Sequence, residues 1–552
     1  MVGMFSIFKK NRRPEIFLPP LKKHPFSFSL DHLSVGVDNF RFDVRLSPEF
    51  CRYSGEIISL LFSKQFQMPI LFPVEKPSDW NKNLNELKRL HHEMMMDALH
   101  KAKLFSEPQI EILAQIALLK TVREQLRVGF DSMIDTVKKS IHHYDMSDHH
   151  ELGDTIKTKE SLNRVLKSKT LICRNTGIEF FQHLASIRSE ELKAVRQSIF
   201  GPDTVPIDHY FTTPLIHADN FFEDSMLMNE YQVMFGRREE DADRYDSLVD
   251  HLREILRNFI ENQSPAAMGI HTGIGGVPVS ETGPSSVPDA DGLIKNAANF
   301  EMLFNYFKTA EKFKNLKKQH APRQELASVK RRLEGERWIL DDFYRYFKKL
   351  DLTKRFTALY LMQPLLEEYS PPLHPQQILL YLVNPHTRSG VARKLKQLGK
   401  FYNRSFSTDL LNKTGRKLAK ISEEEHKAYM CRFITGISRY HCDLRIATEL
   451  REAMERIRLV SDEKIIHLSR ANNTLYEFLL DSEKTREEKP IIRHAVLKAD
   501  VRGSTEITFQ MKQKGLNPAS FFSLNFFDPI SKLLPDYGAS KIFIEGDAVI
   551  LA

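Results

Sequence analysis

The chain has 552 residues, of which 41% are hydrophobic and 28% are charged, and its formal net charge is +8. This composition excludes a disordered or fibrous protein and indicates a globular one with two to four domains. The longest apolar stretches, such as residues 378–383, are far shorter than the roughly 20 residues that cross a bilayer. The positive charge permits an acidic partner but selects none.

The N-terminal segment and the cysteines indicate a cytoplasmic protein. In residues 1–15 the basic cluster follows a brief apolar patch, and no small-residue cleavage site comes after it, which is the wrong order for a secretory signal. The cysteines are scattered and form no CxxC pair: Cys51, Cys173, Cys431 and Cys442. We therefore expect reduced thiols, with neither disulfides nor a structural zinc.

Residues 26–46 alternate between apolar and polar side chains. Phe40, Phe42 and Val44, for example, occupy every second position with polar residues between them. A period of two is typical of half-buried strands. We expect these strands to form a small sheet in an N-terminal β-containing region of residues 1–80.

Helical periodicity then predicts a first helical domain over residues 81–262. In its clearest helix, 246–262, one apolar stripe consists of Leu248, Leu252, Ile255, Leu256 and Phe259. Residues 263–292 are rich in Gly, Pro and Ser and show no helical pattern. We interpret this segment as a linker or long loop and as a domain boundary.

A second helical domain with a helical connector is predicted for residues 293–490. Its part from 446 to 480 has few helix breakers and an imperfect apolar seam, so we expect a long helix or a helical pair there. This seam fits a partner helix or packing within the domain. Lys and Arg recur along 311–324 and 392–406, which we interpret as solvated helix faces in preference to a nucleic-acid groove.

Three segments resemble sites in composition but not in spacing. Residues 141–154 contain four histidines, three aspartates and a glutamate, and residues 90–100 combine His, Glu and three methionines. Neither has a zinc spacing such as HExxH, so we interpret the first as a polar connection and the second as helix packing. The glycines of 273–276 lack the Lys-Ser/Thr pair of a phosphate loop.

The C-terminal segment, 491–552, has the most chemically directed pattern in the chain. Residues 491–500 predict an apolar strand that enters the core and ends at Asp500. Gly503 permits a tight turn, and Ser504 or Thr505 is expected to cap a helix that closes at Gly515.

Two further elements follow in this segment. Asn517 and Pro518 begin a second helix, whose apolar stripe runs from Phe522 to Leu534. Residues 540–552 predict a two-stranded hairpin with Asp547 at the exit of its turn. The expected order is thus strand, helix, helix, hairpin.

Asp500 and Asp547 converge if the first and second strands of this segment are neighbours. Paired carboxylates suit a pair of divalent cations, and the backbone N–H groups of a glycine turn at a helix N-terminus suit a phosphate chain. Two metals on a nucleoside triphosphate activate an attacking hydroxyl and stabilise the leaving pyrophosphate. The alternative is that both aspartates only cap turns.

Residues 500–505, DVRGST, resemble the first metal motif of the class III adenylate/guanylate cyclases, and residues 546–552, GDAVILA, resemble the second. The resemblance implies that Asp500 and Asp547, with the Val501 carbonyl, hold two Mg²⁺ or Mn²⁺ ions. It also implies that the turn containing Arg502 and Gly503–Thr505 cradles the triphosphate of ATP or GTP. The products are a cyclic nucleotide and pyrophosphate, and members of this family work as dimers.

The resemblance has two departures from the family pattern. Phe543 stands where the family has its purine-selecting lysine, and Lys541 lies two residues earlier on the same strand face. The resemblance covers only about residues 491–552, so we expect an incomplete catalytic domain that is inactive by itself. The expected fold class is mainly α with a small N-terminal β region, followed by an incomplete α+β, ferredoxin-like cyclase domain.

Three functions follow as hypotheses. The first is a cytoplasmic signalling protein whose helical region regulates a C-terminal nucleotidyl cyclase and forms a homodimer through the cyclase domain and the preceding helix. The second is a non-catalytic helical regulatory or scaffold protein with a degenerate cyclase remnant. The third, binding of nucleic acid through the basic helices, is the least favoured. It requires binding to DNA or RNA that weakens steeply as the salt concentration rises.

Overall fold

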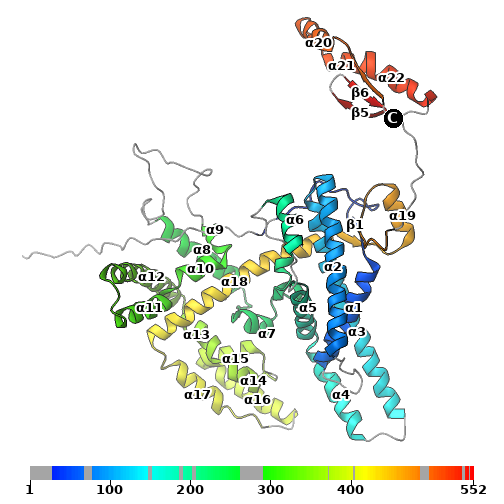
Figure 1. Cartoon of the computed structure of the whole chain (residues 1–552). Coiled ribbons are helices and arrows are strands. Elements are labelled where there is room, and N and C mark those ends of the chain that lie inside the picture. The colour runs from blue at the N-terminus through cyan, green and yellow to red at the C-terminus, as the bar shows by residue number, and fades with distance from the viewer. Residues whose placement is uncertain are drawn as a thin grey trace, which may run out of the picture. The chain divides into compact units, whose positions relative to one another are not determined.

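The computed structural model describes residues 26, 28–66, 77–146, 152–185, 190–201, 207–261, 290–370, 372–401, 405–484, 497–537, 541–545 and 548–551. The chain forms two compact units, the helical unit (Met1–Asp481) and the C-terminal unit (Ser482–Ala552). The fold class is mainly helical, with one small sheet in each unit (Figure 1). Within the described residues, no helix combines the length and the apolar character needed to cross a membrane.

The first half of the helical unit is built on long antiparallel helices. The pairs α1–α3, α2–α3 and α1–α2 pack together, and α5 covers α1 and α3. The faces of α3 that meet these neighbours carry Leu113, Ile116 and Val122, all fully buried. The elements are β1 (Phe42–Leu46), α1 (Pro48–Phe66), α2 (Pro77–Phe105), α3 (Gln109–Met146), α4 (Leu152–Lys167), α5 (Lys169–Ala185) and α6 (Glu190–Phe200).

Short helices and turns form the second half of this unit. Phe356 on α13 stacks on Phe433 of the next long helix, with ring centroids 3.9 Å apart. The elements are η1 (Ile207–Tyr210), η2 (Pro214–His217), α7 (Asp224–Met226), η3 (Leu227–Tyr231), α8 (Tyr245–Glu261), α9 (Ala290–Ile294), α10 (Ala297–Leu303), α11 (Tyr306–Lys318), α12 (Arg323–Lys349), α13 (Thr353–Leu361), α14 (Gln363–Tyr369), α15 (Pro375–Val383), η5 (Pro385–Thr387), α16 (Arg388–Phe401) and α17 (Asp409–Leu418).

Helix α18 (Glu423–Glu455) connects the two halves of the helical unit (Figure 1). It contacts α10, α12 and α13 along one part of its length, and α3 and η2 toward its C-terminal end. A capping box fixes its start: the Ser422 hydroxyl accepts from the N–H of Glu425, and the Glu425 carboxylate accepts from the N–H of Ser422. Helices on both sides of the predicted linker therefore belong to one compact unit.

The sheet of the helical unit differs from the predicted N-terminal sheet. Of residues 26–46, only 42–46 form a strand, and its partners are β2 (Ile457–Leu459) and β3 (Leu475–Phe478), both parallel to it. The strand order is β2-β1-β3, with α19 (Glu463–Ala471) connecting β2 to β3. The prediction of several N-terminal strands was wrong, as was that of a continuous helix or helical pair over 446–480.

A tight turn explains why the alternation before residue 42 does not make strands. The Asp38 carboxylate accepts from the N–H groups of Phe40 and Arg41, and the N–H of Gly36 donates to the Arg41 carbonyl. Asn39 has a φ of 59°, in the left-handed region. Phe40 is consequently 82% exposed, although its place in the alternation predicts a buried side.

Several helical predictions are confirmed. The apolar stripe predicted for residues 246–262 is buried in α8, where Leu248, Leu252, Ile255 and Leu256 are at most 3% exposed. Met94 and Met95 are buried in α2, as helix packing predicts. The cysteines are free thiols. Residues 147–151 of segment 141–154, and residues 263–289 of the predicted linker, lie outside the described residues, whereas 290–294 form α9.

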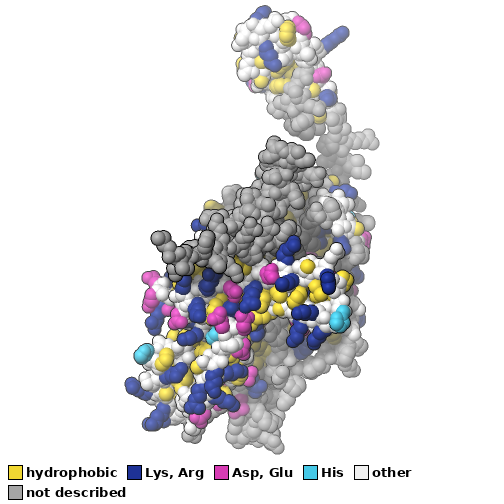
Figure 2. Space-filling model, turned by 90° about the vertical axis from the view of Figure 1, so that its left-hand side faces the viewer, with side chains coloured by type: hydrophobic (Ala, Val, Ile, Leu, Met, Phe, Trp, Pro, Cys, Tyr) yellow, Lys and Arg dark blue, Asp and Glu magenta, His cyan; other side chains and the backbone are white. Residues whose placement is uncertain are grey.

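The basic stretches lie on solvated helix faces, as predicted. On α11, Lys312, Lys314 and Lys317 are exposed, and on α16, Arg393 and Lys396 are exposed. Figure 2 shows Lys and Arg side chains interspersed with Asp and Glu on one face of the helical unit. Mixed charges of this kind do not concentrate the positive field as a nucleic-acid groove does.

A buried carboxyl group predicts a pH-dependent stability. The Tyr231 hydroxyl donates to Asp443 Oδ2 (2.8 Å), and burial raises the pKa of Asp443 from 3.8 to about 6. The folded protein holds this proton more tightly than the unfolded chain, so the free energy of unfolding decreases as the pH rises from about 4 to about 6. We expect a decrease of about 1–2 kcal/mol from this group.

The measurement is urea denaturation of the wild type and of Asp443→Asn at pH 4 and pH 6.5. We expect the free energies of unfolding at the two pH values to differ less in Asp443→Asn than in the wild type. The exposed Asp246 provides the matched control, because Asp246→Asn removes a carboxyl group that is not buried. Equal pH dependence in the wild type and Asp443→Asn would contradict the assignment.

Candidate functional site

The predicted site lies in the C-terminal unit, whose sheet has the order β4-β6-β5. The strands are β4 (Leu497–Asp500), β5 (Lys541–Glu545) and β6 (Ala548–Leu551), and all pairs are antiparallel. The helical elements between them are α20 (Ser504–Gln513), α21 (Pro518–Phe522), η6 (Ser523–Phe527), α22 (Asp528–Leu533) and η7 (Leu534–Tyr537). The predicted order of strand, helix, helix and hairpin is thus confirmed.

The neighbour of the first strand is β6 and not β5. Adjacency of the first and second strands was the condition for Asp500 and Asp547 to converge, and this condition is not met. The register pairs Asp500 with Ala548, and Glu545 pairs with the same Ala548 from the other side. The turn between β5 and β6 therefore lies at the same end of the sheet as Asp500.

The local sequence explains how the first motif is held. Asp500 ends β4 with an exposed side chain, and the Val501 carbonyl accepts from the N–H of Ser504 (3.3 Å). Gly503 has a φ of 75°, which L side chains rarely adopt, so it turns the chain directly into α20. Arg502 is exposed in this turn.

The predicted cap of α20 was wrong by one residue. Gly503 occupies the cap position, no side chain caps the helix there, and Ser504 and Thr505 lie in its first turn. Because the hydroxyl groups do not occupy the cap position, they do not satisfy the first N–H groups as an N-cap does. Such N–H groups form a site for an anion. The predicted end at Gly515, with a φ of 70°, and the Asn517 cap are confirmed.

The side chains of two predicted site residues, Asp547 and Lys541, lie outside the described part of the structure. Gly546 and Asp547 lie outside the described residues, and for Lys541 only the backbone, in β5, is described. Among the described residues, no group of three or more His, Cys, Asp or Glu side chains is placed to hold a metal ion. The described part of the predicted site thus consists of Asp500, Val501, Arg502 and the glycine turn, which follow one another in the chain.

The C-terminal unit buries little of its apolar surface, contrary to the prediction that its first strand enters a core. In its described part the buried apolar side chains are Met511, Phe522, Ala548 and Val549. The exposed large ones, at 41–82% exposure, are Leu497, Phe509, Leu516, Phe521, Leu524, Leu533 and Tyr537. These exposed side chains leave much of the apolar surface of the unit in contact with solvent.

Gly503→Ala tests the turn directly. We expect it to destabilise the start of α20 by about 1 kcal/mol, because an L side chain is strained at this φ. A Cβ atom there meets nothing within 4 Å, so the cost comes from the backbone alone. Hydrogen exchange of residues 504–513 is expected to be faster in Gly503→Ala than in Ser504→Ala, and equal rates would contradict the assigned turn.

Comparisons of the chain with protein-family models, with curated proteins and with solved structures find no match.

Proposed function

We propose that this chain is a cytoplasmic signalling protein whose C-terminal unit contributes a class III nucleotidyl cyclase site. ATP or GTP is its substrate, and a cyclic nucleotide and pyrophosphate are its products. The observation that carries the proposal is the register of β4 and β6, which pairs Asp500 with the residue that follows Asp547. Asp500 and Ala548 therefore share one end of adjacent strands, and Ala548 directly follows Asp547 in the sequence.

The donor set at this end of the sheet fits a divalent cation in its chemistry. Asp500 offers an exposed carboxylate, and Val501 offers a backbone carbonyl. Mg²⁺ and Mn²⁺ prefer such oxygen ligands, and Asp547 supplies a second carboxylate in the proposal. When bound, a pair of these ions lowers the pKa of the attacking hydroxyl and neutralises charge on the phosphates.

The remaining residues of the first motif bind and orient the triphosphate in this proposal. The N–H groups in the first turn of α20 follow Gly503 directly, and a helix N-terminus favours negative charge. Arg502 adds an exposed positive charge next to this turn. Lys541, on β5, is proposed to contact the purine in place of the lysine that the family has at the position of Phe543.

The assembly is proposed to be a homodimer. The exposed apolar side chains of the C-terminal unit, for example Leu524 and Leu533, give it a surface that a second copy can cover. A ferredoxin-like catalytic domain whose site is shared across such an interface is the fold we propose for this unit. The helical unit is proposed to regulate the assembly.

Product formation tests the proposal. The full chain is incubated with ATP or GTP and Mn²⁺, and cyclic nucleotide and pyrophosphate are quantified together with metal-dependent binding of the triphosphate. Formation of both products in equal amounts supports the enzyme. Binding without product favours the non-catalytic regulatory protein with a cyclase remnant, and the absence of metal-dependent binding contradicts a nucleotide site in this unit.

A further inference from the structure

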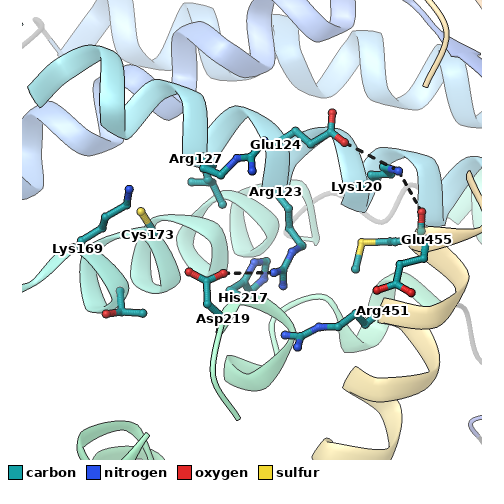
Figure 3. A pocket seen from close by; sticks show the side chains of 13 residues that line it. Lys120, Arg123, Glu124, Arg127, Lys169, Cys173, His217, Asp219, Arg451 and Glu455 are labelled. Carbon is teal, nitrogen blue, oxygen red and sulfur yellow. Dashed lines mark hydrogen bonds and ion pairs between the residues drawn. The ribbon is translucent and has the colours of Figure 1, made fainter. Parts of the chain in front are cut away.

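A cavity of about 360 Å³ lies in the helical unit, between α3, α5, η2 and the C-terminal end of α18 (Figure 3). Its volume falls within the roughly 300–1,000 Å³ of small-molecule sites. Three carboxylates line it, against five basic side chains, which are Lys120, Arg123, Arg127, Lys169 and Arg451. An excess of positive charge in a concave site favours an anionic ligand.

Two of these cations are held by the protein itself and form the walls. Lys120 Nζ donates to the carbonyl oxygens of Met454 (3.1 Å) and Ile457 (2.6 Å), which connects α3 to the end of α18. Lys169 Nζ donates to the Asp131 carboxylate (2.7 Å). These contacts fix the shape of the cavity, so the cations that a ligand could contact are Arg123, Arg127 and Arg451.

Arg123 and Arg451 reach toward Asp219 and His217 from different walls of the cavity (Figure 3). Arg451 is fixed, because its Nη2 donates to the Ala218 carbonyl (2.7 Å). Arg123 Nη1 is buried and has no hydrogen-bond partner in the described part of the chain. Its nearest carboxylate, Asp219, is 3.7 Å from Nη2 and 82% exposed, too distant and too hydrated to neutralise two guanidinium groups.

The electrostatics of this pair favour an added anion. Burial and the like charge of Arg451 lower the pKa of Arg123, and burial lowers the pKa of Arg451. Both shifts mean that the charged guanidinium groups are insufficiently compensated in this environment. An anion between them supplies the missing compensation, which makes its binding favourable.

His217 adds an uncharged ring to the wall of the cavity. Its side chain is 6% exposed, and its Nε2 lies 2.6 Å from the Phe211 carbonyl oxygen, so Nε2 carries the proton. Burial lowers the pKa of His217 to about 4, so the ring is neutral near pH 7. Its Nδ1 has no hydrogen-bond partner among the described residues and lies against Gly177 of α5, where a Cβ atom would meet it at 2.5 Å.

We propose that this cavity binds a phosphorylated small molecule, with the phosphate on Arg123 and Arg451. The planar guanidinium group pairs with phosphate oxygens through two parallel hydrogen bonds. A phosphate monoester carries a charge of about −1.5 to −2 near pH 7, which matches the surplus of two cations better than one carboxylate does. The site belongs to the helical unit and is independent of the proposed cyclase site.

The test is calorimetric titration of the full chain, without divalent metal, with inorganic phosphate and with ribose 5-phosphate. Because charge-assisted hydrogen bonds contribute about 1.5–3 kcal/mol, Arg123→Gln is expected to weaken binding at least about tenfold. Arg331→Gln removes an exposed arginine of α12 and is the matched control. Tighter binding of ribose 5-phosphate identifies a phosphorylated metabolite, and binding of inorganic phosphate alone identifies the free ion as the source.

Two further variants keep the test decisive. Asp500→Ala is expected to leave this binding unchanged, which separates it from the proposed nucleotide site. Arg127→Gln changes an exposed residue that lines the cavity, so we expect the variant to fold. It is expected to weaken binding by a smaller factor, about threefold. Absence of binding by both probes, or equal binding by Arg123→Gln, Arg127→Gln and Arg331→Gln, overturns the proposal.

Discussion

Asp500→Ala is expected to reduce metal-dependent cyclisation of ATP or GTP at least about 100-fold in a chain that shows this activity. The reason is that the proposed site has two carboxylates, and losing one removes both a metal ligand and negative charge that holds the cations near the triphosphate. Metal stabilisation of the developing charge is a term of several kcal/mol, so the effect on the rate is large. The measurement is the initial rate of cyclic nucleotide formation at saturating Mn²⁺.

The controls for Asp500→Ala come from the same unit. Asp528→Ala removes an exposed carboxylate that pairs with Lys532 on α22 (2.7 Å), and it is expected to leave the rate within about twofold. Asp500→Asn keeps the shape of the side chain and is expected to lose activity as Asp500→Ala does, because the charge is required. Retention of more than half the activity in both Asp500 variants would show that this residue is not a metal ligand.

Asp43→Ala is expected to destabilise the helical unit by about 3–5 kcal/mol. Asp43 is fully buried in β1, where one carboxylate oxygen accepts from Arg458 Nε (2.7 Å) and the other from the N–H of Val37 (3.0 Å). Removing one partner of a buried ion pair is strongly destabilising. Here it leaves the Arg458 guanidinium on β2 with only the more distant Asp38 carboxylate, 3.5 Å from Nη1. The pair connects strands that are more than 400 residues apart in the chain.

Chemical denaturation followed by circular dichroism measures this effect. Arg458→Met in the Asp43→Ala background is expected to restore part of the lost stability, because it removes a charge that has lost its buried partner. Asp246→Ala is the surface control, since the exposed pair of Asp246 with Arg244 (3.4 Å) contributes at most about 1 kcal/mol. A change below about 1 kcal/mol in Asp43→Ala would contradict the role assigned to this pair.

Local periodicity predicted the helices well, because a stripe of apolar side chains and its caps are encoded within one segment. Helix α8, the end of α20 at Gly515 and the start of α21 at Asn517 illustrate this. The same reasoning placed a hairpin at residues 540–552, where β5 and β6 lie. These elements depend on neighbours only a few residues away, so the sequence by itself contains the information.

The sheet of the helical unit could not be predicted in this way. Ile457 and Leu475 lie in an apolar seam that fits a helix. They are strand residues because β2 and β3 pair with the two edges of β1. Asp43 looks like the polar side of a half-buried strand, and only its pairing with Arg458 shows that it is buried. Register between distant segments has no local signature.

The candidate sites divide in the same manner. The sequence alone determined the chemistry of the C-terminal motif: an aspartate at a strand end, a glycine that turns the chain, and a helix that follows at once. Only the tertiary structure decided that β6 lies beside β4, and that Arg123, His217 and Arg451 share one cavity. Those three residues come from α3, η2 and α18, and packing brings them together, whereas periodicity assigned each only to its own segment.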